Sequence, residues 1–258
     1  MSLKGYVLDN GRMFGPTKTI LSNAAPDELS YIPIYSVLLQ HKDGNVLFDA
    51  GCHVDESRQT PFILEGARVK DEDHIISRLA EIGFSPEDIN YLVLSHLHAD
   101  HTGYIELFPN AEIYVSDNEF TNTIKQYALG TAVDMGNIEH WIKCKLKWKL
   151  LPDKEEMIGL LDGITIVNLG SGHSFGMIAL LIDFPKTGKV ILTSDAIYTR
   201  ANIEQPRVPP SMGYDMEGLN NTLDRIAELA ANENAAIWYG HDMEQFDGLI
   251  KSTEGYYE

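Results

Sequence analysis

Apolar and polar positions follow two different periods along this chain. Short apolar runs predict strands at residues 31–39, 45–48, 91–94, 112–115, 164–169, 177–184, 189–193 and 235–239. Apolar positions three and four residues apart predict helices at residues 73–82 and 216–231. Residues 116–127 are also predicted to be helical, and the acidic Asp117 and Glu119 favour the start of this helix. The strands form two clusters, each accompanied by helices. This order predicts an α/β (α+β) fold in which two sheets pack face to face with helices outside, as one domain over residues 1–258.

Residues 128–160 follow neither period. They contain Trp141, Trp148 and charges of both signs, and we interpret them as an insert or a helical cover. Four lysines alternate with less polar residues in this segment: Lys143, Lys145, Lys147 and Lys149. Such alternation is typical of a strand or an extended edge that turns its lysine face to water, and a local basic patch is the alternative.

A cluster of metal-binding residue types follows the apolar run at residues 91–94. The sequence Ser-His-Leu-His-Ala-Asp-His begins at residue 95 and places His96, His98, Asp100 and His101 within six positions. His96 and His98 point to the same side of an extended segment, because side chains alternate with a period of two. Imidazole binds zinc, iron, cobalt and nickel, and a carboxylate adds an oxygen ligand. The spacing predicts a metal centre; a polar turn that happens to be rich in histidine is the alternative.

Three more residues of these types each come shortly after a predicted strand: His173, Asp195 and His241. Functional side chains concentrate where strands end in loops. Taken singly, each has a structural explanation, such as a loop histidine or an aspartate that caps a turn. Together with the first cluster they provide five histidines and two aspartates, which is enough for two adjacent metal ions.

Charge and composition narrow the choice of partners. The net charge of −18, from 20 Lys and Arg against 38 Asp and Glu, offers no basic footprint for nucleic acid and repels anionic lipid. No apolar run approaches the roughly 20 residues that span a bilayer, and residues 1–6 lack the pattern of a secretion signal. We therefore expect a cytoplasmic protein without nucleic-acid or membrane partners. Cys52 and Cys144 form no disulfide framework, so we expect both to be reduced.

The chain resembles the metallo-β-lactamase superfamily. The order His-x-His-x-Asp-His, then His, Asp and His matches the superfamily motif over nearly the whole chain. Within the superfamily the chain is most similar to the N-acyl-homoserine lactone lactonases, in residues 95–103, 193–199 and 240–245. The resemblance implies a four-layer αβ/βα sandwich of two mixed sheets, with a dinuclear metal site at one sheet edge.

The resemblance also implies roles for individual residues. Seven match the metal ligands of the family: His96, His98 and His173 for one ion, Asp100, His101 and His241 for the other, and Asp195 as a bridge between them. Asp49, in an Asp-x-Gly turn, would orient a ligand imidazole. Tyr198 matches the lactonase tyrosine that contacts the substrate carbonyl. The chain departs from the family at Gly170–Gly172, where Thr-Pro-Gly is common, and at Ala99, where some lactonases have a bulky aromatic residue.

The resemblance implies an enzyme that hydrolyses the lactone ring of N-acyl-homoserine lactones, and hence acts in quorum quenching, without a serine or cysteine nucleophile. Two divalent ions, zinc first and iron, manganese or cobalt as alternatives, would lower the pKa of a shared water, so that a bridging hydroxide attacks the lactone carbonyl. One ion and the Tyr198 hydroxyl would stabilise the oxyanion. The resemblance implies that Asp100 carries a proton to the leaving ring oxygen. Asp100 and Tyr198 are therefore the catalytic residues that we expect.

The acyl tail of such a substrate requires an apolar groove. We expect residues in loops to supply it: Met13, Phe14, Ile63, Leu64, Trp141 and Met212. The histidines outside the motif are predicted to be surface or loop residues: His41, His53, His74 and His140.

Other functions stay open from the sequence alone. Another superfamily hydrolase, acting on a different lactone, a thioester, a β-lactam or a phosphoester, would use the same ions. The acidic charge disfavours a nuclease, and His98 disfavours the di-iron redox branch, which usually has glutamate at that position. A non-catalytic metal-binding protein is the third hypothesis, and the retention of all seven ligand positions together with Tyr198 argues against it. The expected partner is a small molecule, and both a monomer and a homodimer are compatible with the sequence.

Overall fold

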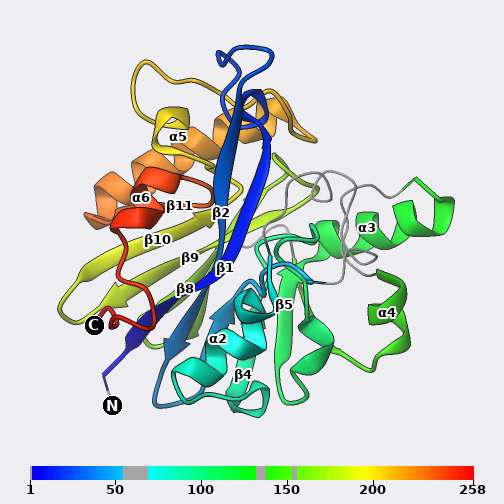
Figure 1. The fold of residues 1–258 in the computed structure, drawn as a ribbon, viewed down its shortest axis with the longest axis vertical. Coiled ribbons are helices and arrows are strands. Elements are labelled where there is room, and N and C mark those ends of the chain that lie inside the picture. The colour runs from blue at the N-terminus through cyan, green and yellow to red at the C-terminus, as the bar shows by residue number, and fades with distance from the viewer. Residues whose placement is uncertain (1, 55–68, 132–137, 153–155) are drawn as a thin grey trace.

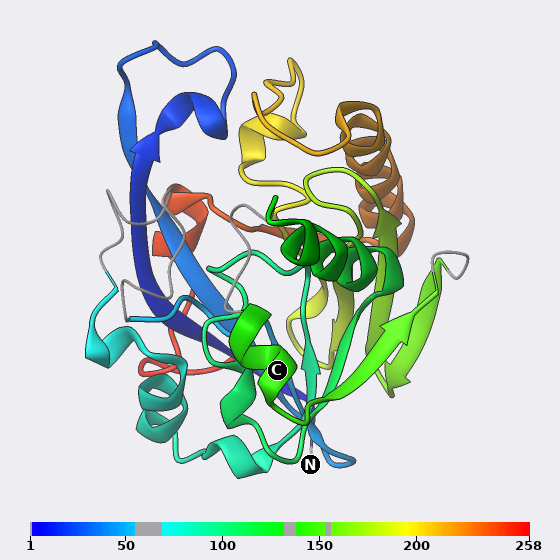
Figure 2. The ribbon, with the colours of Figure 1, turned by 90° about the vertical axis from the view of Figure 1, so that its right-hand side faces the viewer.

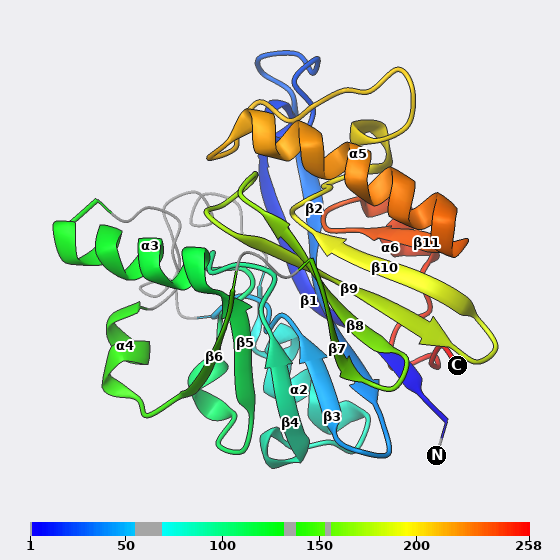
Figure 3. The ribbon, with the colours of Figure 1, turned by 180° about the vertical axis from the view of Figure 1, so that it is seen from behind.

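The computed structural model describes residues 2–54, 69–131, 138–152 and 156–258. Two β-sheets pack face to face, and helices lie on the outer face of each sheet, as Figure 1 and the rotated views in Figure 2 and Figure 3 show. The four layers confirm the fold class that the apolar pattern predicts.

The first sheet has six strands in the order β1-β2-β3-β4-β5-β6. Their bounds are Lys4–Pro16 for β1, Leu29–Gln40 for β2, Asn45–Phe48 for β3, Ile89–Val93 for β4, Glu112–Ser116 for β5 and Lys147–Leu151 for β6. Strands β1 to β3 pair antiparallel, whereas β3 to β6 run parallel. The carboxyl ends of β3 and β4 therefore lie at the same edge of this sheet.

The second sheet has five strands in the order β11-β10-β9-β8-β7. Their bounds are Met157–Leu161 for β7, Ile164–Gly170 for β8, Met177–Phe184 for β9, Gly188–Ser194 for β10 and Ala236–Tyr239 for β11. Strand β9 is antiparallel to both of its neighbours, and β10 is parallel to β11. Strands β8, β10 and β11 therefore point the same way and end at one edge.

Five α-helices complete the described part of the chain: α2 at Ile75–Glu81, α3 at Asp117–Leu129, α4 at Ile138–Lys143, α5 at Met216–Glu233 and α6 at Met243–Gly248. Helices α2 and α4 bury apolar side chains such as Leu79 and Trp141 against the outer face of the first sheet. Helix α5 buries Leu223 and Ile226 against the outer face of the second sheet. The core between the sheets combines residues of both, for example Val7 and Val93 with Leu180 and Trp238.

Strand β1 and helix α6 were not among the predicted elements. Val7 of β1 faces the core between the sheets and Leu8 faces the outer core, so both faces of this edge strand are buried. The segment Asp9-Asn10-Gly11 consists of residue types that are common in turns, but β1 continues through it with a shift in register between Asp9 and Arg12. An apolar run followed by apparent turn residues therefore hides a 13-residue strand.

The described residues within 128–160 contribute strands to both sheets as well as a helical cover. Helix α4 lies on the outer face as expected, whereas β6 and β7 extend the two sheets at one side. Lys147 and Lys149 lie exposed on the edge strand β6, which confirms an edge strand with a lysine face there. Lys143 instead ends helix α4.

Among the described residues, no helix combines the length and the apolar character that crossing a membrane requires.

Candidate metal centre

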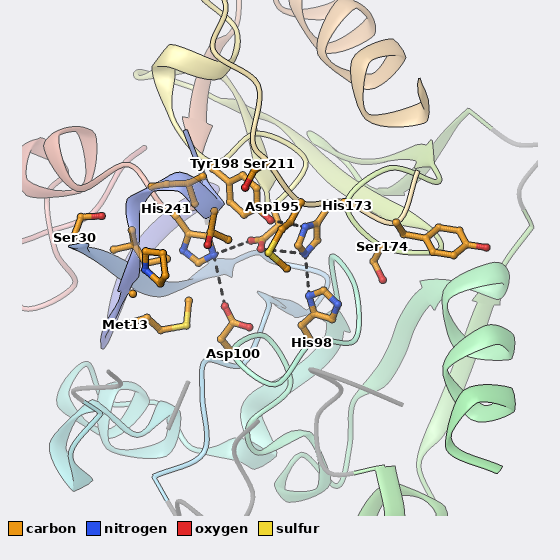
Figure 4. Close-up of a pocket in the computed structure, with 18 of the residues that line it drawn as sticks. Met13, Ser30, His98, Asp100, His173, Ser174, Asp195, Tyr198, Ser211 and His241 are labelled. Atoms are coloured by element: carbon orange, nitrogen blue, oxygen red, sulfur yellow. Dashed lines mark hydrogen bonds and ion pairs between the residues drawn. The ribbon is translucent and has the colours of Figure 1, made fainter. Parts of the chain in front are cut away.

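Histidines and aspartates gather where parallel strands of both sheets end. Residues 96–101 follow β4 of the first sheet. His173, Asp195 and His241 follow β8, β10 and β11 of the second sheet. Because these strand ends face each other across the sandwich, the loops that follow them meet at one edge (Figure 4).

The structure brings all seven predicted residues together in two overlapping groups. The first cluster consists of His96, His98, His173 and Asp195, and the second of Asp100, His101, Asp195 and His241. Within each group the candidate ligand atoms lie within 4.8 Å of one another. Asp195 belongs to both groups, so its two carboxylate oxygens can face two ions.

In the first cluster, imidazole nitrogens and a carboxylate oxygen lie within 4.8 Å of one another. His98 Nδ1 lies 2.9 Å from His173 Nε2, and Asp195 Oδ2 lies 3.3 Å from the same nitrogen. His96 Nε2 is buried and has no hydrogen-bond partner. Spacings of this size between donor atoms are those of ligands around one small cation.

The second cluster is built around two carboxylates. His101 Nε2 lies 3.1 Å from Asp100 Oδ2 and 3.2 Å from Asp195 Oδ1. His241 Nε2 lies 3.0 Å from Asp195 Oδ1 and 3.6 Å from Asp100 Oδ2. Two buried carboxylates at this distance from shared imidazoles require positive charge between them.

The two clusters differ in their protonation. Burial, and then the neighbouring imidazoles, lower the pKa of His96 well below its ordinary value and that of His98 to about 3. Burial also acts against a charged His101, but Asp100, Asp195 and Asp49 raise its pKa well above the ordinary value. The first cluster therefore offers neutral imidazoles, whose lone pairs can bind a cation. In the second cluster a cation would displace protons from between the carboxylates.

Unsatisfied atoms show that this donor set fits metal ions. Three buried side-chain atoms of the two clusters form no hydrogen bond, although His101 Nε2 and Asp195 Oδ1 have close nitrogen or oxygen neighbours: His96 Nε2, His101 Nε2 and Asp195 Oδ1. Leaving such groups unpaired costs about 1–3 kcal/mol each, and buried polar groups in native proteins almost always have partners. A cation in each cluster would satisfy all three atoms.

Groups behind the clusters fix the ring orientations. His101 Nδ1 donates to Asp49 Oδ2 over 2.8 Å, which is the role predicted for Asp49. Asp49 also accepts from Ser95 and from the Ser194 hydroxyl. His241 Nδ1 donates to the Pro33 carbonyl over 2.8 Å. Such partners hold a ligand histidine in one tautomer and one orientation.

Asp49 and Ser194, two residues of this network, have strained backbone conformations. Their φ angles are 59° and 47°, which lie in the left-handed region that non-glycine residues seldom adopt. A conformation of this kind costs of order 1–3 kcal/mol and persists where the surroundings enforce it. Position 240, which packs against Ser194, accepts only glycine, because a Cβ atom there would lie 2.5 Å from the Ser194 carbonyl oxygen.

Tyr198 lies at the mouth of the first cluster. Its hydroxyl is 2.5 Å from His173 Nδ1, and its side chain lines the adjoining cavity (Figure 4). The Tyr198 hydroxyl, which is predicted to contact a substrate carbonyl, therefore already forms a hydrogen bond with the candidate metal ligand His173.

A cavity of about 570 Å³ opens directly onto both clusters. His98, Asp100 and Asp195 form part of its floor, and apolar side chains form much of its wall: Met13, Phe14, Ile20, Ile32, Phe175, Met212, Tyr214 and Met216. Met13, Phe14 and Met212 are thus where the sequence placed them.

The other three predicted groove residues have different outcomes. The prediction for Trp141 was wrong, because its side chain is buried in the core beneath α4 and does not line the cavity. Ile63 and Leu64 lie outside the described residues. Ala99 is buried against Ile34 and Cys52, and its side chain does not line the cavity either.

The remaining histidines do not join the clusters. His41 and His53 lie in loops, as predicted, and both side chains are buried. His74 caps helix α2 by accepting a hydrogen bond from the Ile76 amide, and His140 lies on helix α4 facing Glu106. Cys52 and Cys144 are both free thiols, as expected.

Sequence reasoning missed one residue next to the centre. Glu119 was interpreted only as an acidic residue favourable to the start of a helix, but its side chain is fully buried beside the loops that carry His98 and His173. Burial raises the pKa of this carboxyl to about 7, against the lowering effect of its hydrogen bonds. In the sequence, Glu119 is simply an acidic residue in the first turn of a helix capped by Ser116, and such a position does not predict contact with the metal-binding loops.

The four-layer sandwich with paired His and Asp clusters at its edge defines a metal-dependent hydrolase fold. The family model described as the metallo-beta-lactamase superfamily matches residues 31–119. The chain is 32% identical to the N-acyl homoserine lactonase AiiB of Agrobacterium fabrum, over 99% of this chain and 94% of that protein. It is 30% identical to an N-acyl homoserine lactonase of a Bacillus species, over 95% of each.

Solved structures agree with these relatives. An N-acyl homoserine lactone hydrolase with the product N-hexanoyl-L-homoserine bound at its catalytic metal centre superposes with a TM-score of 0.85 at 27% identity, over the full length of both chains. A quorum-quenching N-acyl homoserine lactone lactonase gives a TM-score of 0.85 at 28% identity, over 100% of this chain and 99% of that one. The chain belongs to the metallo-beta-lactamase superfamily, and the relatives that it matches over nearly its full length include N-acyl homoserine lactonases.

Proposed function

We propose that this protein is a metal-dependent hydrolase that opens the lactone ring of N-acyl homoserine lactones, and so serves in quorum quenching. One observation carries the proposal: two donor clusters that share Asp195 form the floor of a cavity whose wall is largely apolar. The polar floor suits a lactone head group and the wall suits an acyl tail. The family relationship over the full chain supports the same substrate class.

We propose the seven clustered residues as the ligands of two divalent ions. His96, His98 and His173 would hold one ion, Asp100, His101 and His241 the other, and Asp195 both. A site of nitrogen and oxygen donors accepts zinc, iron, manganese or cobalt, and zinc is our first choice. When bound, such ions lower the pKa of water and polarise a carbonyl oxygen.

Asp100 is the proposed carrier of the proton. Its carboxylate lines the cavity, beside the place where the lactone head group would lie. Hydrolysis forms a bond between the water oxygen and the carbonyl carbon and breaks the bond from that carbon to the ring oxygen. Asp100 would accept a proton from the water and deliver it to the ring oxygen, which leaves as the hydroxyl of the homoserine product.

Tyr198 is the proposed hydrogen-bond donor to the substrate carbonyl oxygen. Its hydrogen bond with His173 determines the direction in which the hydroxyl proton points. An imidazole that binds a cation through Nε2 keeps its proton on Nδ1. His173 Nδ1 would then donate to the Tyr198 oxygen over the observed 2.5 Å. The Tyr198 hydroxyl proton is thereby directed toward the cavity, where it can stabilise the negative charge that develops on the carbonyl oxygen.

A panel of substrates tests the proposal. The zinc-loaded protein would be offered acyl-homoserine lactones of several tail lengths, simple lactones, a thioester, a β-lactam and a phosphodiester, with acid release followed for each. We expect acyl-homoserine lactones to give the highest kcat/KM, and the His98→Ala protein to be inactive on all of them. A preference for another compound would identify a different superfamily hydrolase. Inactivity on the whole panel with two ions bound would favour a metal-binding protein without catalysis.

The cytoplasmic location predicted from the sequence is part of the proposal as well. Fractionation of the producing cells would test it, because a secreted enzyme would appear in the medium.

A further inference from the structure

The carboxylate of Glu119 lies between the two loops that supply the first cluster. Glu119 belongs to the first turn of α3, on neither of these loops, and its side chain is fully buried. One loop follows β4 of the first sheet and carries His96 and His98. The other connects β8 to β9 of the second sheet and carries His173. Helix α3 thus contacts, through Glu119, both of the loops that supply the first cluster.

Each carboxylate oxygen of Glu119 accepts a hydrogen bond from a different loop. Oε1 accepts from the amide of Leu97, over 2.9 Å, and Leu97 separates His96 from His98. Oε2 accepts from the amide of Gly176 over 3.0 Å. The hydroxyl of Ser174, directly after His173, lies within 2.9 Å of both oxygens. A single side chain therefore connects backbone on both sides of the pair His98 and His173.

The approach of the second loop to α3 is unusually close. A Cβ atom at Gly176 would lie 2.8 Å from Ser116 Cβ and 3.1 Å from the Glu119 amide nitrogen. Only glycine permits the backbone to come this near. The Gly176 amide can reach the carboxylate for this reason.

The contacts require a carboxylate rather than any polar group. All the groups that face Glu119 are donors, and among the described residues none forms an ion pair with it. An amide of the same shape would place its NH₂ group against the N–H of either Leu97 or Gly176, whichever way it turned. Replacement by glutamine must therefore break the link to one of the two loops. The helix N-terminus and the backbone amides offset part of the cost of burying this negative charge.

We infer that Glu119 is a positioning residue that holds His98 and His173 in register for the first of the two metal ions. The inference rests on the proposed function, since it needs metal ions at the two clusters. The second cluster has a separate anchor, because Asp49 holds His101 from behind. Loss of the Glu119 carboxylate should therefore weaken the binding of the ion in the first cluster and leave the ion in the second cluster in place.

The test measures zinc binding in the full-length protein. Wild type, Glu119→Gln and Asp117→Asn would be dialysed against zinc buffered by a competing chelator, with bound zinc measured by mass spectrometry. We expect two ions in the wild type, and a 10- to 100-fold weaker affinity for one of them in Glu119→Gln, as for other residues that orient metal ligands. Asp117→Asn removes a charge from the same helix turn at an exposed position, and it should retain both ions.

Double variants identify the ion that is lost. In a His98→Ala background, Glu119→Gln should cause no further change in zinc content, because the first cluster is already broken. In a His241→Ala background, Glu119→Gln should remove the zinc that remains. Additive losses in both backgrounds would show a general structural effect and overturn the inference.

The remaining outcomes separate the inference from the proposed function. A wild type that takes up no zinc would overturn both. Two ions of unchanged affinity in Glu119→Gln would overturn the inference alone. If circular dichroism shows that Glu119→Gln does not fold, Ser174→Ala decides instead, because it removes only the hydroxyl link. A shift of one zinc ion in that variant supports the inference, and an unchanged competition curve overturns it.

Discussion

Tyr198 has two roles in this protein: its hydroxyl forms a hydrogen bond with His173, and its ring lines the cavity. The 2.5 Å contact orients the imidazole of the first cluster, and the same phenol ring lines the cavity. Removing only the hydroxyl oxygen separates these roles, because phenylalanine fills the same space.

We expect Tyr198→Phe to lower kcat for acyl-homoserine lactones by about 10- to 100-fold, which is at or below the usual effect of losing one donor to an oxyanion. Zinc content should stay near two ions per chain. Tyr127→Phe, at a partly exposed tyrosine of α3, is the matched control and should leave kcat unchanged. An unchanged turnover in Tyr198→Phe would remove this residue from the reaction, and a loss of zinc would assign it to the support of His173 instead.

Single residues were predictable from the sequence where the signal was local. Four donors within residues 96–101 and three others directly after apolar runs are visible without a structure. Glu119 and Trp141 were not predictable, because their roles depend on which loops and helices pack against them. An acidic residue in a first helical turn and a tryptophan in an irregular segment have the same sequence signature whether they are exposed or buried.

At the level of elements, the predictions failed where a strand lacks simple alternation. Strand β1 buries Val7 and Leu8 on opposite faces and then accommodates Asp9-Asn10-Gly11 in a shifted register. Strands β6 and β7 lie at the sheet edges, where one face meets water and the apolar signal is weak. The central strands of both sheets were predictable because they are almost wholly apolar.

The burial of β1 on both faces has a measurable consequence. Leu8→Ala should reduce the free energy of unfolding by about 2–5 kcal/mol, because it leaves a cavity at a fully buried site. Leu29→Ala on β2 is the control, since its side chain is 54% exposed, and it should change stability by less than about 0.5 kcal/mol. Urea unfolding monitored by fluorescence measures both. Equal effects would mean that β1 adds little to the core.

The molecule as a whole places its donor residues on two separate sheets. The loop after β4 belongs to the first sheet, and the loops after β8, β10 and β11 belong to the second. Ions held between them would therefore cross-link the sandwich at one edge. The layered architecture followed from the order of apolar runs, but the meeting of these four loops depends on strand direction, which no local pattern specifies.

We expect removal of the ions to lower the thermal stability of the protein. Each ion at 100 times its dissociation constant stabilises the folded state by about 2.7 kcal/mol. At about 2–4 °C per kcal/mol for a chain of this size, loss of both ions should lower Tm by about 10–20 °C. Calorimetry before and after dialysis with a chelator measures the change, and added zinc should restore Tm. An identical Tm after the zinc has been removed would contradict any linkage between the sheets.

The uneven spacing of the donors along the chain bears on synthesis. Four of them are complete once residue 101 has been translated, whereas His241 lies 140 positions later (241 − 101). A nascent chain thus displays a partial chelating group before its second half exists. Capture of an ion at that stage would precede closure of the sandwich. A polypeptide terminated before position 241 would retain a metal-binding loop, yet it would never assemble the bridged pair.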